Sequence, residues 1–101
     1  MKKAIILAAA AWLMTPAAAM AERDGATIYN TKCMACHMTG AAGAPIVGKA
    51  DQWAPRAAKG IDALVVSATN GINAMPPKGT CMDCTESEMK ATIQHMLDNS
   101  K

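Results

Sequence analysis

Apolar residues recur along the chain at helical spacing, and no segment shows the strict alternation of apolar and polar residues that is typical of a strand. The clearest example has apolar residues at positions i, i+3, i+4 and i+7, namely Ile61, Leu64, Val65 and Ala68. Asn70-Gly71 follows this pattern directly and is a typical helix stop. The pattern therefore predicts a helix that begins near Ile61 and ends before Gly71.

A second apolar stripe lies near the C-terminal end, at Met89, Ile93, Met96 and Leu97. Thr85 and Glu88 precede it with the spacing of a capping box, which predicts the start of a helix. Glu86 and Lys90 stand four positions apart, so we expect them to form a supporting ion pair. His95 falls about 145° from the centre of the stripe on a helical wheel, and we expect it to face solvent.

Two further helices are predicted earlier in the chain. Asp24 is a suitable N-cap for a helix over residues 25–33. A short helix over residues 51–59 contains Trp53 and tolerates Pro55 near its first turn. The four predicted helices and the lack of a strand pattern indicate an all-α fold.

Two irregular segments separate these helices. Residues 40–48 are rich in Gly and Ala around Pro45, and residues 72–80 contain Met75-Pro76-Pro77. Long loops in so small a domain are usually functional. We therefore expect both segments to contribute to the site.

The first residues have the pattern of a cleaved signal peptide. Met1-Lys2-Lys3 is a short positive segment, and the apolar stretch over residues 4–14 is too short for a membrane-spanning helix. Ala19-Met20-Ala21 matches an A-x-A cleavage site. We expect residues 1–21 to be removed on export to the periplasm, leaving one domain over residues 22–101 without a stable membrane anchor.

Composition limits what this domain can do. Lys2 and Lys3 account for the formal net charge of +2, so the domain is near neutral and has no electrostatic support for binding nucleic acid. The whole sequence has no phenylalanine, and only one tryptophan, Trp53, lies in the domain. Small domains with so thin a core usually need a covalent staple or a cofactor.

Cys33-Met34-Ala35-Cys36-His37 is the C-x-x-C-H attachment signature of a c-type haem. Two thiols three positions apart on one helical turn can each add to a vinyl group at the porphyrin edge, and the histidine that follows lies beneath the iron. His37 is therefore the predicted proximal ligand. Its other ring nitrogen should donate to a backbone carbonyl, which the loop through Pro45 could supply.

Met75 is the predicted sixth ligand. It lies in a non-helical loop far from His37 in the sequence, and Pro76-Pro77 stiffens the chain that would hold its sulfur against the iron. The other methionines of the domain flank the attachment motif, lie between the second pair of cysteines or belong to the apolar stripe of the last helix. A structural methionine that only packs the loop is the alternative.

Cys81-x-x-Cys84 allows three interpretations. It could complete a Cys₄ zinc site, but the gap to the first pair is long for a zinc ribbon and export disfavours free thiolates. It could hold a second haem, but Thr85 stands where a histidine is required. A local disulfide that closes a tight loop before the last helix is the interpretation we favour.

Together these segments resemble a class I monohaem cytochrome c. The run from Asn70-Gly71 through Met75-Pro76-Pro77 to Cys81-x-x-Cys84 is similar, more narrowly, to bacterial cytochrome c5. The resemblance implies a small all-α fold of about four helices around one covalent haem c.

The resemblance also implies a role for individual residues. Thioether bonds would form at Cys33 and Cys36, His37 and Met75 would be the axial ligands, Cys81 and Cys84 would form a disulfide, and the Pro45 carbonyl would accept a hydrogen bond from the proximal histidine. Trp53 and Arg56 lie where they could contact a haem propionate.

Iron with two protein ligands has no open site for oxygen or substrate, which favours a one-electron carrier over an enzyme. We expect its partners to be redox proteins, such as a membrane quinol-oxidising complex, a terminal oxidase or a periplasmic reductase, and the carrier to be a monomer or weak dimer. A haem enzyme or gas sensor with a displaceable sixth ligand, and a zinc-binding interaction module, are the alternatives.

Overall fold

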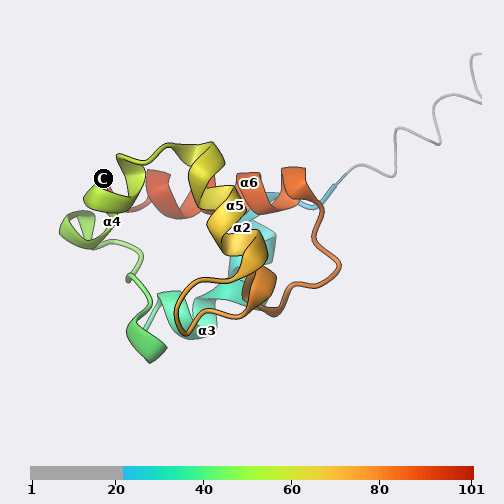
Figure 1. Cartoon of the computed structure of the whole chain (residues 1–101), viewed down its shortest axis with the longest axis horizontal. Coiled ribbons are helices and arrows are strands. Elements are labelled where there is room, and N and C mark those ends of the chain that lie inside the picture. Colours follow the sequence, from blue (N-terminus) through green and yellow to red (C-terminus); the bar gives the residue numbers. More distant parts are fainter. Residues whose placement is uncertain (1–21) are drawn as a thin grey trace, which may run out of the picture.

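The computed structural model describes residues 22–101, so the predicted signal peptide lies outside the described residues. Helices and loops make up the described part, and its one extended pairing is an isolated bridge between Ile72 and Met75. The elements are α2 (Gly25–Ile28), the π-helical turn η1 (Tyr29–Cys33), α3 (Met34–His37), the 3₁₀ turn η2 (Ala41–Gly43), α4 (Ala50–Ala57), α5 (Ile61–Asn70), the 3₁₀ turn η3 (Pro77–Thr80) and α6 (Glu86–Asp98). The predicted all-α fold is confirmed (Figure 1).

The first helical stretch is longer than predicted. Asp24 caps its start as expected, because its side chain accepts a hydrogen bond of 2.7 Å from the N–H group of Thr27. The stretch does not end at Cys33 but continues through the π-helical turn η1 into α3 and ends at His37. Gly40, whose left-handed backbone has a φ of +82°, then turns the chain away from the helical direction.

The N-terminal and C-terminal helices pack directly against each other. Gly25 is buried at this contact, where a Cβ atom added to it would lie 2.2 Å from the carbonyl oxygen of Ala91. Helix α5 also packs against α6, as Figure 1 shows in the centre of the molecule. Helix α6 therefore packs against both the first helical stretch and α5.

Helix α6 begins with the predicted capping box. Thr85 accepts from the N–H group of Glu88, and the Glu88 carboxylate accepts from the N–H group of Thr85. The predicted ion pair between Glu86 and Lys90 is wrong, because the Lys90 ammonium lies 3.7 Å from the carboxylate of Asp62 on α5. A partner across the helix contact replaces the expected partner on the same helix.

Helices α4 and α5 follow their predicted ranges closely. Helix α4 begins at Ala50, which places Pro55 in its second turn rather than its first, where the ring removes one hydrogen bond of the helix. Helix α5 ends at Asn70, and Gly71 leaves it with a φ of +90°. In the described residues, no helix has the length and apolar character needed to cross a membrane.

The core is small, as the composition predicts. Its buried apolar members are Ile28, Tyr29, Trp53, Val65, Ala68, Cys81, Cys84, Met89, Ile93 and Met96. A second set of apolar residues packs against this core but remains half-buried, namely Cys33, Met34, Val47, Ile61, Leu64, Met75 and Leu97. This half-buried set contains residues from the attachment motif, from α5 and from the Met75 loop.

Candidate haem site

His37 lies at the end of α3, and only 7% of its surface is exposed. Its Nδ1 atom lies 2.9 Å from the carbonyl oxygen of Pro45. A carbonyl can only accept, so Nδ1 carries the proton and Nε2 keeps a free lone pair. The backbone around this contact is closed by a second hydrogen bond of 2.8 Å, from the N–H group of Val47 to the carbonyl oxygen of His37.

Trp53 supports the loop that holds His37. Its ring packs on the imidazole with a distance of 5.8 Å between the ring centroids. Its indole N–H group donates to the carbonyl oxygen of Ile46 at 2.9 Å. Tryptophan has this one donor, so a hydrogen bond from Trp53 to a propionate would require the bond to Ile46 to break. The indole thus supports the loop after Pro45, and the propionate contact expected of Trp53 stays a prediction.

Arg56 lies on the same helix as Trp53 and is half-buried. One of its guanidinium nitrogens donates to the carbonyl oxygen of Gln52 at 2.6 Å. The Gln52 side chain in turn accepts from the N–H group of Ile46 at 2.8 Å. The guanidinium has five N–H donors, so the bond to Gln52 leaves others for an anion, and the propionate contact stays a prediction.

The two cysteines of the motif are both free thiols. Cys33 is the last residue of the π-helical turn and is half-buried, whereas Cys36 is exposed in α3. Burial, and to a smaller extent the neighbouring Cys36, raises the pKa of the Cys33 thiol. π-Helical turns within helices are frequent at functional sites. Here the turn comes directly before the four residues that end in His37.

Met75 lies at the end of a tight turn that begins at Ile72. The two residues exchange backbone hydrogen bonds of 2.9 and 3.1 Å. Gly71 lies close beneath this turn, since a Cβ atom added to it would come within 3.1 Å of the Met75 carbonyl oxygen. The methyl end of the Met75 side chain lies near Gly79, where an added Cβ atom would be 3.3 Å from Cε. Backbone neighbours thus require glycine at position 71, whereas a side chain at position 79 would meet only the movable end of Met75.

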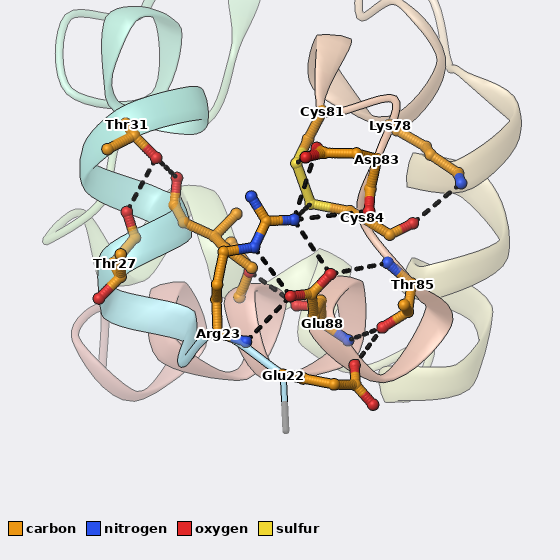
Figure 2. The surroundings of a disulfide bond; sticks show 12 residues. Glu22, Arg23, Thr27, Thr31, Lys78, Cys81, Asp83, Cys84, Thr85 and Glu88 are labelled. Carbon is orange, nitrogen blue, oxygen red and sulfur yellow. Dashed lines mark hydrogen bonds and ion pairs between the residues drawn. A yellow bond between two sulfur atoms is a disulfide. The ribbon is translucent and has the colours of Figure 1, made fainter. Parts of the chain in front are cut away.

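Cys81 and Cys84 form a disulfide in the structure, and both are almost completely buried. The bond leaves neither sulfur as a thiolate for zinc, so the structure favours the third of the three interpretations. Figure 2 shows that the disulfide lies between the loop after Met75 and the start of α6.

Arg23 and Glu88 form an ion pair beside this disulfide that sequence reasoning did not find (Figure 2). Two guanidinium nitrogens of Arg23 donate to the two carboxylate oxygens at 2.9 and 3.1 Å, and the Arg23 backbone N–H group donates at 3.0 Å. The Arg23 side chain, together with the N–H group of Thr85, lowers the pKa of Glu88 to about 2. Another guanidinium contact, of 3.4 Å, reaches Asp83 within the disulfide loop.

His95 differs from its prediction, because it is half-buried rather than turned to solvent. Its ring lies 5.4 Å from the ring of Tyr29, measured between centroids. The crossing of the first helical stretch over α6 covers this side of the helix, which a wheel drawn for α6 alone does not include. His95 therefore takes part in the contact between the two helices.

These side chains have the chemistry that a c-type haem requires. The two thiols lie one helical turn apart, the buried imidazole presents an unprotonated Nε2, and the thioether lies in a loop among half-buried apolar residues. Cys33, Cys36, His37 and Met75 would hold the group, and the half-buried apolar set would enclose its ring. The residues present thus fit a haem bound through two thioether bonds.

Known proteins are similar to this chain over most of its length. The family described as cytochrome C oxidase, cbb3-type, subunit III matches residues 20–96. Cytochrome c5 of Azotobacter vinelandii is 49% identical over 76 residues, which cover 73% of this chain and 92% of that protein.

Two solved structures are similar as well. A mono-haem ferrocytochrome c from Shewanella putrefaciens has a TM-score of 0.69 and 47% identity, covering 80% of this chain and 99% of that chain. A chain in the electron transfer complex of nitrite reductase with cytochrome c has a TM-score of 0.75 and 35% identity, covering 79% of this chain and 98% of that chain.

The helical fold and the C-x-x-C-H segment together define a small monohaem protein of the electron-transport class. The chain belongs to the cytochrome c family, and it carries one covalently bound haem c.

Proposed function

We propose that this chain is a periplasmic one-electron carrier whose haem is bonded to Cys33 and Cys36 and ligated by His37 and Met75. The observation that carries the proposal is the hydrogen bond between His37 Nδ1 and the Pro45 carbonyl oxygen. It fixes the imidazole as the tautomer that ligates through Nε2, and it does so in a buried position.

The surrounding residues would hold both axial ligands in place. Trp53 and the loop through Pro45 hold the imidazole from behind, and the turn from Ile72 to Met75 holds the thioether. The bound haem supplies an iron that takes up or releases one electron. Because both axial ligands come from held segments, the residues need little rearrangement between the two oxidation states.

A redox protein is the partner that this site requires. The similar chain in an electron transfer complex with nitrite reductase supports a protein partner in general terms. We propose a membrane quinol-oxidising complex, a terminal oxidase or a periplasmic reductase as the class of donor or acceptor. The exposed turn Ala41–Gly43 offers small side chains over which such a partner could approach closely.

The absorption spectrum of the oxidised protein tests the axial ligands. Ligation by methionine gives a weak long-wavelength sulfur-to-iron band, which we expect in the wild type and not in Met75→Ala. The variant should also have a lower reduction potential, because a neutral thioether favours the ferrous state. A wild-type protein without the band would favour the alternative of a haem enzyme or gas sensor with an open sixth position.

A further inference from the structure

Lys78 lies three residues after Met75 in an unusual stretch of backbone. Lys78, Gly79 and Thr80 all have left-handed φ values, of 56°, 56° and 72°. This conformation is costly for residues with a Cβ atom, and most of all for the β-branched Thr80. The segment therefore needs other contacts to hold it in this shape.

The side chain of Lys78 makes such a contact. Its ammonium donates to the backbone carbonyl oxygen of Cys84 at 3.0 Å, and the residue is half-buried. Figure 2 shows the lysine reaching across from the loop to the disulfide. A lysine that served only for solubility or docking would point its ammonium into water.

On the lysine side of this contact, the backbone is linked to the Met75 segment. The N–H group of Gly79 donates to the carbonyl oxygen of Pro76 at 2.9 Å, and Gly79 lies against the methyl end of the Met75 side chain. The backbone of Lys78 also accepts a hydrogen bond of 2.9 Å from the N–H group of Cys81. A movement of Lys78 would therefore be transmitted to the segment beside the methionine.

On the acceptor side, Cys84 is held in place by several contacts. Cys84 is 2% exposed and is bonded to Cys81. Arg23 approaches the same loop from the N-terminal side, with a guanidinium nitrogen 3.5 Å from the carbonyl oxygen of Asp83 and 3.8 Å from the sulfur of Cys84. Arg23 is in turn held by Glu88 of α6. The carbonyl that Lys78 uses thus belongs to an anchored loop.

We infer that Lys78 is a positioning residue for the sixth ligand, which holds the Met75 segment against the anchored disulfide loop. This inference rests on the proposed function, because it assumes that Met75 ligates the iron. A charged hydrogen bond is stronger than a neutral one, and its loss would free the chain that carries the methionine. Lys78 would act on the ligand through the loop and not by contact with the haem.

Denaturant titration of the oxidised holoprotein separates positioning from general stability. The sulfur-to-iron band reports ligation, and far-ultraviolet circular dichroism reports the helices. In Lys78→Ala we expect the equilibrium constant for Met75 ligation to fall about tenfold, so that the band disappears at lower denaturant than the helical signal. Lys78→Arg keeps the charge and the donor, and it should restore most of the wild-type behaviour.

Lys59→Ala is the matched control, since it removes an equal charge from an exposed lysine just after α4. We expect both signals of this variant to follow the wild type. If Lys78→Ala lost the band and the helices together, or neither signal moved, the positioning role would be wrong. A wild-type protein without the band would instead overturn the proposed ligation by Met75, and the two failures are distinct.

Discussion

The Nδ1 atom of His37 and the carbonyl oxygen of Pro45 lie 2.9 Å apart. This single contact decides which nitrogen of the ring can bind a metal, because the proton on Nδ1 leaves the free lone pair on Nε2. The loop after the attachment motif thus determines the chemistry of the histidine within the motif.

Trp53 should contribute to this contact through its bond to Ile46, the residue after Pro45. Trp53→Phe removes the indole donor and keeps most of the ring, so we expect a loss of about 1–2 kcal/mol in the free energy of unfolding. Trp53→Ala also leaves a cavity and should cost about 3–5 kcal/mol. Denaturant unfolding of the holoprotein measures both, and a Trp53→Phe variant as stable as the wild type would contradict a role for the N–H group.

The disulfide should stabilise the loop beyond Met75 to a modest degree. For so short a loop, the chain-entropy model gives about 2 kcal/mol, which Cys81→Ala/Cys84→Ala should lose in denaturant unfolding. Met82→Ala is the control, because Met82 lies within the same loop and is 68% exposed. Alkylation of the unreduced, unfolded protein should leave Cys81 and Cys84 unmodified, and labelled cysteines at these positions would contradict the disulfide.

Features determined by neighbouring residues were predictable from the sequence. The capping box at Thr85, the Asp24 cap and the end of α5 at Gly71 all depend on groups within one helical turn, and all three are present. The fold class followed from the same patterns together with the attachment motif.

Features that depend on distant partners were not predictable. Arg23 and Glu88 stand 65 positions apart, so no local pattern links them. Lys90 pairs with α5 in place of Glu86, and His95 is covered by Tyr29, because the packing of whole helices decides both contacts. The hydrogen bond from the Trp53 indole to the carbonyl oxygen of Ile46 likewise depends on how the loop folds, and no sequence motif indicates it.

Glu88 should make the stability of the protein depend on acid pH. Its pKa is about 2 in the folded protein and 4.5 by its ordinary value, mainly because Arg23 holds the carboxylate. Because the pKa is lowered on folding, the ionised Glu88 carboxylate contributes fully to the stability of the fold above pH 4.5. This contribution is lost as the pH falls towards 2.

Unfolding measured at intervals between neutral pH and pH 2 checks this dependence. Glu88→Gln should be less stable than the wild type at neutral pH and should show a flatter decline in acid. Glu86→Gln, an exposed carboxylate on the first turn of the same helix, should keep the wild-type profile. An unchanged profile in Glu88→Gln would show that the acid sensitivity arises elsewhere.

Gly25 should be the residue that least tolerates a side chain. An added Cβ atom would lie 2.2 Å from the carbonyl oxygen of Ala91 and 2.6 Å from its carbonyl carbon. Both are backbone atoms of α6, so no side chain can turn away, and the two helices must separate. Because α6 also carries Glu88 and Ile93, we expect Gly25→Ala to destabilise the fold by about 2–3 kcal/mol.

Gly43→Ala provides the comparison for the Gly25 variant, because an added Cβ atom there meets nothing within 4 Å. Its left-handed φ of +82° alone should cost about 1 kcal/mol. We therefore expect the Gly25→Ala holoprotein to have a clearly lower unfolding midpoint than the Gly43→Ala holoprotein. Equal midpoints would mean that the helices can move apart at this crossing, and that the close approach of Gly25 to Ala91 is not required for the fold.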